Sequence, residues 1–245
     1  NMSEARTVSA NFSPLSYSLT VNSGSGGSAS GSGTYNYGNS PPITASPSTG
    51  HAFLSWSGSG VTNPSNATTT VSMTGNRTVT ANFQPLTYAL NLSAGTGGSV
   101  TGSGNFTHGQ TPVITATAGM GYVFSSWSGN GVVNPASAST TVNMTQARSV
   151  SASFAPATYA LSLTSGTGGS VGGAGVYSHG STPTITATPN TGYSFSSWSG
   201  SGVTNASNQT TTVTMTQPRD ISASFTPLSY PLIITSGEGG SVSGS

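Results

Sequence analysis

One interval dominates this sequence: its large aromatic residues recur every 71 positions, without insertion or deletion. The tryptophans stand at 56, 127 and 198, and tyrosines, phenylalanines and methionines repeat at the same step, while the polar residues between them vary. A folded core predicts this contrast, because buried side chains must fit one another whereas solvent-facing ones need only be polar. The chain is therefore expected to be a tandem array of folded modules and not a disordered Gly- and Ser-rich polymer.

The period divides the chain into three full repeats and two partial ones. The full repeats are 15–85, 86–156 and 157–227. Residues 1–14 correspond to the end of a preceding repeat, and residues 228–245 to the start of a further one. We expect the natural chain to continue beyond both ends.

Apolar and polar residues alternate within each repeat, which is typical of half-buried strands. In the second repeat this pattern covers 88–92, 111–117, 140–145 and 148–154, and a Gly-rich turn at 95–98 leads to a short strand ending near Phe106. Segments 140–145 and 148–154 are predicted to form a hairpin. No helical stripe occurs. The predicted fold is all-β: a tandem array of small six-stranded β-sandwich or β-grasp-like modules without helices.

The strand that precedes each tryptophan has a change of parity. Tyr122 and Phe124 share one face of an ideal strand, whereas Trp127 falls on the other. Either a bulge lies between Phe124 and Trp127, or the strand ends there and Trp127 folds back. The sequence leaves both interpretations open.

The predicted core consists of the large apolar residues that keep the 71-residue interval. Its members are Trp56, Trp127, Trp198, Phe53, Phe124, Phe195, Tyr88, Tyr159, Phe83, Phe154, Met73, Met144 and Met215. One tryptophan in a small β-module is more often a core anchor than an exposed platform for a sugar ring.

Arginine occupies the one charged position that recurs, at Arg77, Arg148 and Arg219 within the full repeats. Its guanidinium is expected to cap carbonyl groups or stack on an aromatic ring at a strand end, and a contact with a neighbouring repeat or a partner is the alternative. Four basic and three acidic residues give a formal net charge of only +1. This charge balance predicts neither nucleic-acid binding nor attraction to an anionic membrane.

The sequence predicts no catalytic, cofactor-binding or metal-binding residue. The Gly95-Thr-Gly-Gly98 turn lacks the following helix and the lysine of a phosphate-binding loop. His108 and His179 occupy equivalent positions, but Tyr37 stands there in the first repeat and no second ligand type recurs nearby. No carboxylate recurs, there is no Cys, and no apolar run is long enough for a membrane span. An enzyme is not expected.

Several ordered motifs together resemble the divergent internalin-type B-repeat family of bacterial surface proteins. The third repeat carries them as Ile185-Thr-Ala-Thr-Pro189 and Gly192-Tyr-Ser-Phe-Ser-Ser-Trp-Ser-Gly200, and the resemblance extends over the whole chain. It implies a small all-β module of secreted or cell-wall proteins, used in stalks or adhesive arrays, with no catalytic residues to transfer.

These observations predict a structural segment of a long extracellular or cell-surface protein, forming a rod, stalk or filament. The alternative is an adhesive module that binds a glycan or a protein through aromatic surfaces. The expected partners are the neighbouring repeats and other copies of the chain, because a domain of this size without disulfides or metals is marginally stable alone. No cofactor is expected.

Overall fold

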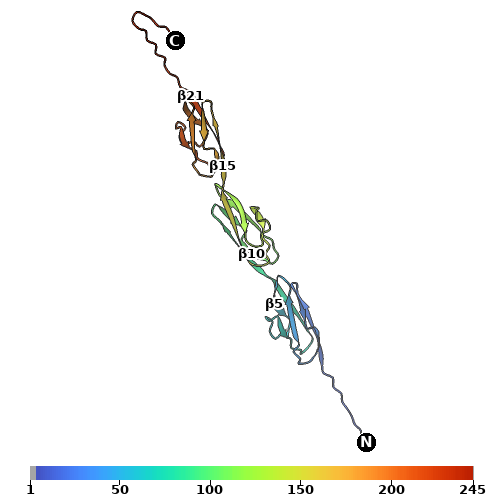
Figure 1. Ribbon diagram of the computed structural model, residues 1–245. Coiled ribbons are helices and arrows are strands. Elements are labelled where there is room, and N and C mark those ends of the chain that lie inside the picture. The colour runs from blue at the N-terminus through green and yellow to red at the C-terminus, as the bar shows by residue number, and fades with distance from the viewer. Residues whose placement is uncertain (1–3, 245) are drawn as a thin grey trace. The chain divides into compact units, whose positions relative to one another are not determined.

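In the computed structural model, which describes residues 4–244, every regular element is a β-strand (Figure 1). Residues 1–3 of the first predicted partial repeat, and residue 245 of the last, lie outside the described part of the chain. The absence of helices among the described residues confirms the all-β prediction.

Each full repeat contains seven strands. The first has β1 (Ser16–Ser23), β2 (Gly27–Ser30), β3 (Gly33–Asn36), β4 (Pro42–Pro47), β5 (His51–Ser57), β6 (Thr68–Thr70) and β7 (Arg77–Pro85). The second has β8 (Thr87–Ala94), β9 (Gly98–Thr101), β10 (Gly104–Thr107), β11 (Val113–Ala118), β12 (Tyr122–Ser128), β13 (Ser139–Thr141) and β14 (Arg148–Pro156). The third has β15 (Thr158–Ser165), β16 (Gly169–Gly172), β17 (Gly175–Ser178), β18 (Thr184–Pro189), β19 (Tyr193–Ser199), β20 (Thr210–Thr212) and β21 (Arg219–Pro227).

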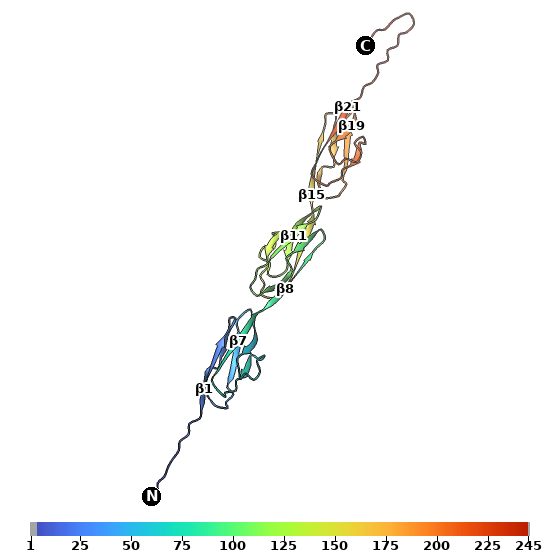
Figure 2. The same cartoon turned by 180° about the vertical axis from the view of Figure 1, so that it is seen from behind.

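The seven strands of a repeat form two sheets that share one core. In the first repeat the sheets have the orders β3-β1-β7-β5 and β2-β4-β6, and the other two repeats follow the same plan. Leu19 and Val79 from the larger sheet and Ile43 from the smaller one belong to a single buried cluster, so the module is a sandwich. β1 and β7, both labelled in Figure 2, pair in parallel, whereas β3 and β5 pair with them antiparallel.

The sandwich has one strand more than predicted, because the segment after the Gly-rich turn forms two strands. In the second repeat β9 joins the three-stranded sheet and β10 the four-stranded one. The chain changes sheets at Gly102, where φ is +112° and a Cβ atom would lie 2.4 Å from the carbonyl oxygen of Val113. Only glycine combines that backbone angle with that close approach. The alternation pattern cannot detect strands of four residues around such a corner.

The predicted hairpin between 140–145 and 148–154 is wrong. β13 pairs with β11, and β14 belongs to the other sheet. Between them Val142 and Met144 are fully buried, and the backbone nitrogen of Met144 donates to the carbonyl of Gln110. This stretch crosses from one sheet to the other. Its apolar residues alternate because Val142 and Met144 both point into the core, and not because the segment pairs in a hairpin.

A bulge resolves the change of parity before tryptophan. The register between β5 and β7 shifts between Phe53 and Ser55, and that between β19 and β21 shifts between Phe195 and Ser197. The extra residue lets a phenylalanine and the tryptophan of one strand both contact the core.

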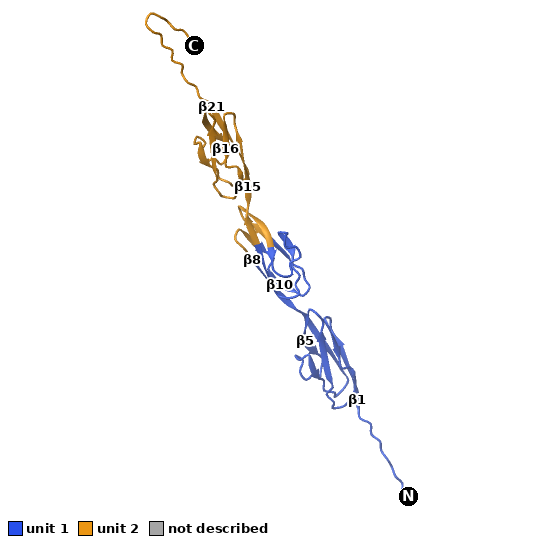
Figure 3. Ribbon diagram, viewed as in Figure 1, with its two compact units in different colours: residues 1–93, 100–115, 127–152 blue, residues 94–99, 116–126, 153–245 orange. Residues whose placement is uncertain are grey.

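The described chain divides into two compact units, coloured in Figure 3. One comprises residues 1–93, 100–115 and 127–152, and the other residues 94–99, 116–126 and 153–245. The first repeat lies within one unit, the third within the other, and the second contributes strands to both.

Candidate functional site

The three tryptophans are core anchors. Trp56, Trp127 and Trp198 are only 3–4% exposed. Each indole Nε1 donates to a carbonyl oxygen ten residues further along the chain, at 3.1, 3.1 and 3.0 Å, and the acceptors are those of Asn66, Ser137 and Asn208. These bonds fasten the long loop after β5, β12 or β19 over the core. A sugar cannot stack on rings that are covered in this way.

The other predicted core residues are buried to different degrees. Met73, Met144 and Met215 are fully buried, whereas the phenylalanines and tyrosines of the prediction are half-buried. The phenylalanines form edge-to-face pairs, with centroid distances of 6.1 Å for Phe53–Phe83, Phe124–Phe154 and Phe195–Phe225. In this geometry the positive edge of one ring faces the negative face of the other.

Arg77, Arg148 and Arg219 each bind within their own repeat. The guanidinium of Arg77 donates to the hydroxyls of Ser59 and Thr74, both at 2.7 Å. Arg219 makes the same two contacts, with Ser201 at 2.6 Å and Thr216 at 3.0 Å, and its Nε donates to the carbonyl of Thr214 at 3.3 Å. In the first and third repeats the arginine thus joins the loop after the tryptophan to the turn before the last strand, whereas Arg148 donates to Asn143 and Thr145. These bonds reach neither a neighbouring repeat nor a charged partner.

Contact between consecutive repeats is made instead by the recurring histidine. The ring of His108, from the second repeat, covers Gly50 of the first so closely that a Cβ atom on that glycine would lie 2.5 Å from the ring. Backbone hydrogen bonds flank the ring: Leu86 donates to the carbonyl of Gly50 at 2.8 Å, and His108 donates to that of Leu86 at 2.9 Å. The ring also packs on Tyr88, with a centroid distance of 6.0 Å.

The next junction repeats this arrangement. His179 covers Gly121, where a Cβ atom would lie 2.3 Å from the ring, and it packs on Tyr159 at 5.9 Å. The two flanking backbone bonds recur through Ala157, at 2.8 and 2.7 Å. From the sequence alone these histidines were rejected as metal ligands, and no contact between repeats was predicted for them. The available signal was the joint recurrence of a glycine at 50, 121 and 192 and of a histidine at 108 and 179.

Tyr37 stands at the histidine position of the first repeat. Tyr37 packs on Tyr17 at 6.4 Å, as each histidine packs on its tyrosine, but it is 61% exposed. At the other end of the series, Gly192 has the same left-handed backbone as Gly50 and Gly121, yet its Cβ position is open. At each of the two junctions the histidine ring therefore lies on one left-handed glycine of the repeat before it. We call this position, Gly50 or Gly121, the glycine corner.

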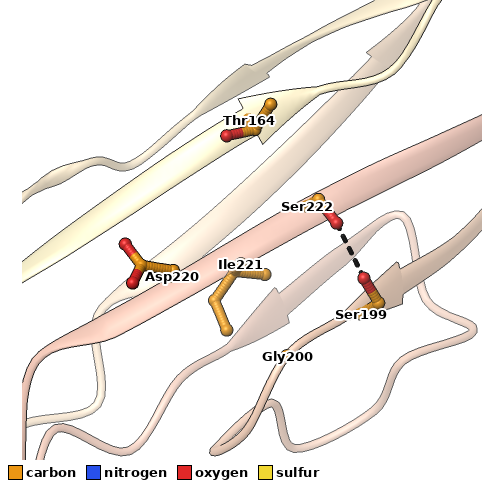
Figure 4. A pocket seen from close by; sticks show the side chains of 6 residues that line it. All are labelled: Thr164, Ser199, Gly200, Asp220, Ile221 and Ser222. Carbon is orange, nitrogen blue, oxygen red and sulfur yellow. Dashed lines mark hydrogen bonds between the residues drawn. The ribbon is translucent and has the colours of Figure 1, made fainter.

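A pocket of about 160 Å³ lies in the third repeat, where β15, β21 and the end of β19 meet (Figure 4). Its lining contains the Asp220 carboxylate and several hydroxyls, two of which, on Ser199 and Ser222, are 2.7 Å apart. Thr78 and Ser149 replace the aspartate in the other repeats. A single carboxylate without a histidine or a cation beside it lacks the paired groups of acid–base catalysis.

Within residues 4–244 no three histidine, cysteine or acidic side chains gather closely enough to bind a metal ion. The same residues contain no helix that would be long and apolar enough to span a bilayer.

A comparison with protein families identifies the chain. The family model described as the divergent InlB B-repeat domain matches residues 17–87, 88–158 and 159–229, three adjoining segments with the 71-residue interval. This family is associated with bacterial surface proteins and is not a known enzyme family. A search of curated proteins found no match. Because the three matches cover most of the sequence, the chain belongs to the divergent InlB B-repeat family, as three tandem copies of its domain.

Proposed function

We propose that this chain is a structural spacer in a secreted or cell-surface bacterial protein, in which consecutive repeats are held together as a rod or stalk. The junction carries the proposal. At both junctions a histidine ring covers the glycine corner of the preceding repeat, and two backbone hydrogen bonds flank it. Only Leu86 separates β7 from β8, and only Ala157 separates β14 from β15. Connections this short, preceded by proline, leave little freedom for one repeat to reorient on the next.

Small-angle scattering tests the spacer proposal. We expect an elongated particle whose maximum dimension grows by about 25–40 Å for each repeat, from the size of a compact domain of this length. Chains with one, two and three repeats give the increment directly. A maximum dimension that stays constant while the chain grows would contradict the proposal.

The junction itself can be tested by comparing two glycines. Gly121 and Gly192 have φ angles of +78° and +85°, and each accepts a backbone hydrogen bond from the residue just after the last strand of its repeat. In either position alanine costs about 1–2 kcal/mol because of the left-handed backbone. Gly121→Ala should cost roughly 1 kcal/mol more, since its Cβ would displace the ring of His179. Thermal unfolding, with hydrogen exchange resolved by repeat, measures the difference.

A double mutant separates the junction from backbone strain. In a His179→Ala background the ring is absent, so Gly121→Ala should cost no more than Gly192→Ala. If Gly121→Ala has the same cost with and without His179, the ring does not join the repeats.

We also propose that copies of the chain associate laterally. The sheets of the first and third repeats end in β2, β3, β5, β6, β16, β17, β19 and β20. The chain contains no lysine, which is the residue that most often protects strand edges from pairing with another chain. A concentration series in the scattering experiment detects such association. Adhesion through the tryptophans has no support, because their rings are buried.

A further inference from the structure

The first and last strands of a repeat lie side by side and run in the same direction. In the first repeat the parallel register runs from Leu19 opposite Arg77 to Ser23 opposite Ala81. In the third repeat it runs from Leu161 opposite Arg219 to Ser165 opposite Ala223. The chain therefore enters each of these repeats at one end of the ladder and leaves it from the other.

This arrangement determines how tension acts on the repeat. When the two ends of the chain are pulled apart, the two strands are drawn past each other, so the evenly spaced hydrogen bonds of the parallel ladder share the force and must break together. Strands pulled apart from one end lose those bonds one after another, at lower force. We propose that each of these repeats is a mechanical clamp, which resists extension of the protein by shear between its first and last strands.

The ladder is shielded on its core face and at both sides from water, which competes for hydrogen bonds under force. β1 lies between β3 and β7, and β7 lies between β1 and β5, so neither strand is at an edge of the sheet. On the core side of the ladder Leu19 is 2% exposed, and Val79 and Ala81 are fully buried. The third repeat has the same order and the same burial at Leu161, Ile221 and Ala223.

Further hydrogen bonds extend the contact beyond the paired residues. In the first repeat Ser18 donates its backbone N–H to the Asn76 Oδ1 at 2.9 Å, before the ladder begins. Gly24 donates to the carbonyl of Ala81 at 2.8 Å, after the ladder ends. Gly166 makes the corresponding bond to Ala223 at 2.9 Å in the third repeat. These bonds must also break before the strands can slide.

The connection between repeats passes tension directly from one clamp toward the next. Pro85 ends β7 and Thr87 begins β8, so a single residue lies between the last strand of one repeat and the first strand of the next. The inference deepens the proposed spacer function, since a stalk experiences tension when the surfaces it joins move apart. The shear geometry itself belongs to the single repeat.

Single-molecule pulling in two directions tests the clamp, and the absence of cysteine allows handles to be attached at chosen sites. In the third repeat of the full chain, handles at Thr158→Cys and Ser229→Cys load the ladder in shear. Handles at Thr158→Cys and Gln217→Cys load the same ladder from one end. All three positions are exposed. Either pair should release about 20 nm on unfolding, at ~3.4 Å per residue.

We expect the shear pair to unfold at several times the force of the one-end pair at equal loading rate. Equal forces would overturn the clamp. The first repeat provides a second set, in which Ser16→Cys is combined with Thr87→Cys for shear or with Gly75→Cys for one-end loading, and circular dichroism confirms that each variant is folded. A compact particle in scattering would refute the spacer without changing the force ratio, so the two proposals can fail separately.

Discussion

Replacing Trp198 with alanine should unfold the third repeat under conditions in which the first repeat stays folded. The side chain is 3% exposed, and its indole holds the loop after β19 through the carbonyl of Asn208. Truncating a buried tryptophan costs about 3–5 kcal/mol. That loss is comparable to the whole stability of a small domain without disulfides or metals.

Hydrogen exchange with mass spectrometry distinguishes the repeats, because their peptides differ in sequence. Peptides from 157–227 should lose protection in Trp198→Ala, whereas those from 15–85 should keep it. The control is Val176→Ala, in the same repeat, whose side chain is 69% exposed and whose loss should change stability by less than about 0.5 kcal/mol. Unchanged protection in 157–227 would contradict the role of Trp198 as the core anchor.

The second large loss of stability is expected when Gly169, which lies directly against the ring of Phe225, is given a side chain. A Cβ atom on Gly169 would lie 2.2 Å from the ring of Phe225, which is itself packed edge-to-face on Phe195. The φ angle of Gly169 is not in the left-handed region, so the clash alone opposes a side chain. Gly169→Ala should therefore destabilise the third repeat by about 1–3 kcal/mol, the usual cost of overpacking a core.

Gly172 is a matched control for Gly169, since it lies in the same strand, β16, without a positive φ angle and with no atom near its Cβ position. Gly172→Ala should be neutral or stabilise the repeat by up to about 1 kcal/mol, because alanine restricts the unfolded chain. The melting temperatures of the two variants provide the measurement. Similar melting temperatures would show that the phenylalanine pair moves aside without cost.

The 71-residue interval marks part of the core, because burial acts on single positions. A buried tryptophan or methionine must be replaced by a residue of similar volume in every repeat, so the interval itself marks the inside of the module. All three tryptophans and all three methionines named from the sequence are buried. The strand pairing was harder to predict, because a crossing segment such as Val142–Met144 alternates just as a hairpin strand does.

The contacts between repeats were difficult to predict from the sequence for a different reason. Six strands, β5 to β10, lie between Gly50 and His108 in the sequence, and their contact depends on how one sandwich ends and the next begins. The arginine is the one recurring charge, so a contact between repeats was considered for it, but its bonds lie within one repeat. A guanidinium finds hydroxyl and carbonyl partners locally, whereas the histidine ring meets a bare backbone in another repeat.

The parallel pairing of first and last strands also affects the order in which the chain folds. Ser18 and its partner Asn76 are 58 residues apart in sequence, so a repeat closes its larger sheet only after nearly all of it has been synthesised. Pairings of such long range form slowly. During synthesis, the first of these last strands to become available to a first strand is the one from its own repeat, so no wrong partner competes for pairing. If a finished chain is unfolded, however, β7, β14 and β21 become available together, and β1 can pair with any of them. Refolding from denaturant should therefore yield strand-swapped arrays that synthesis from the N-terminus avoids.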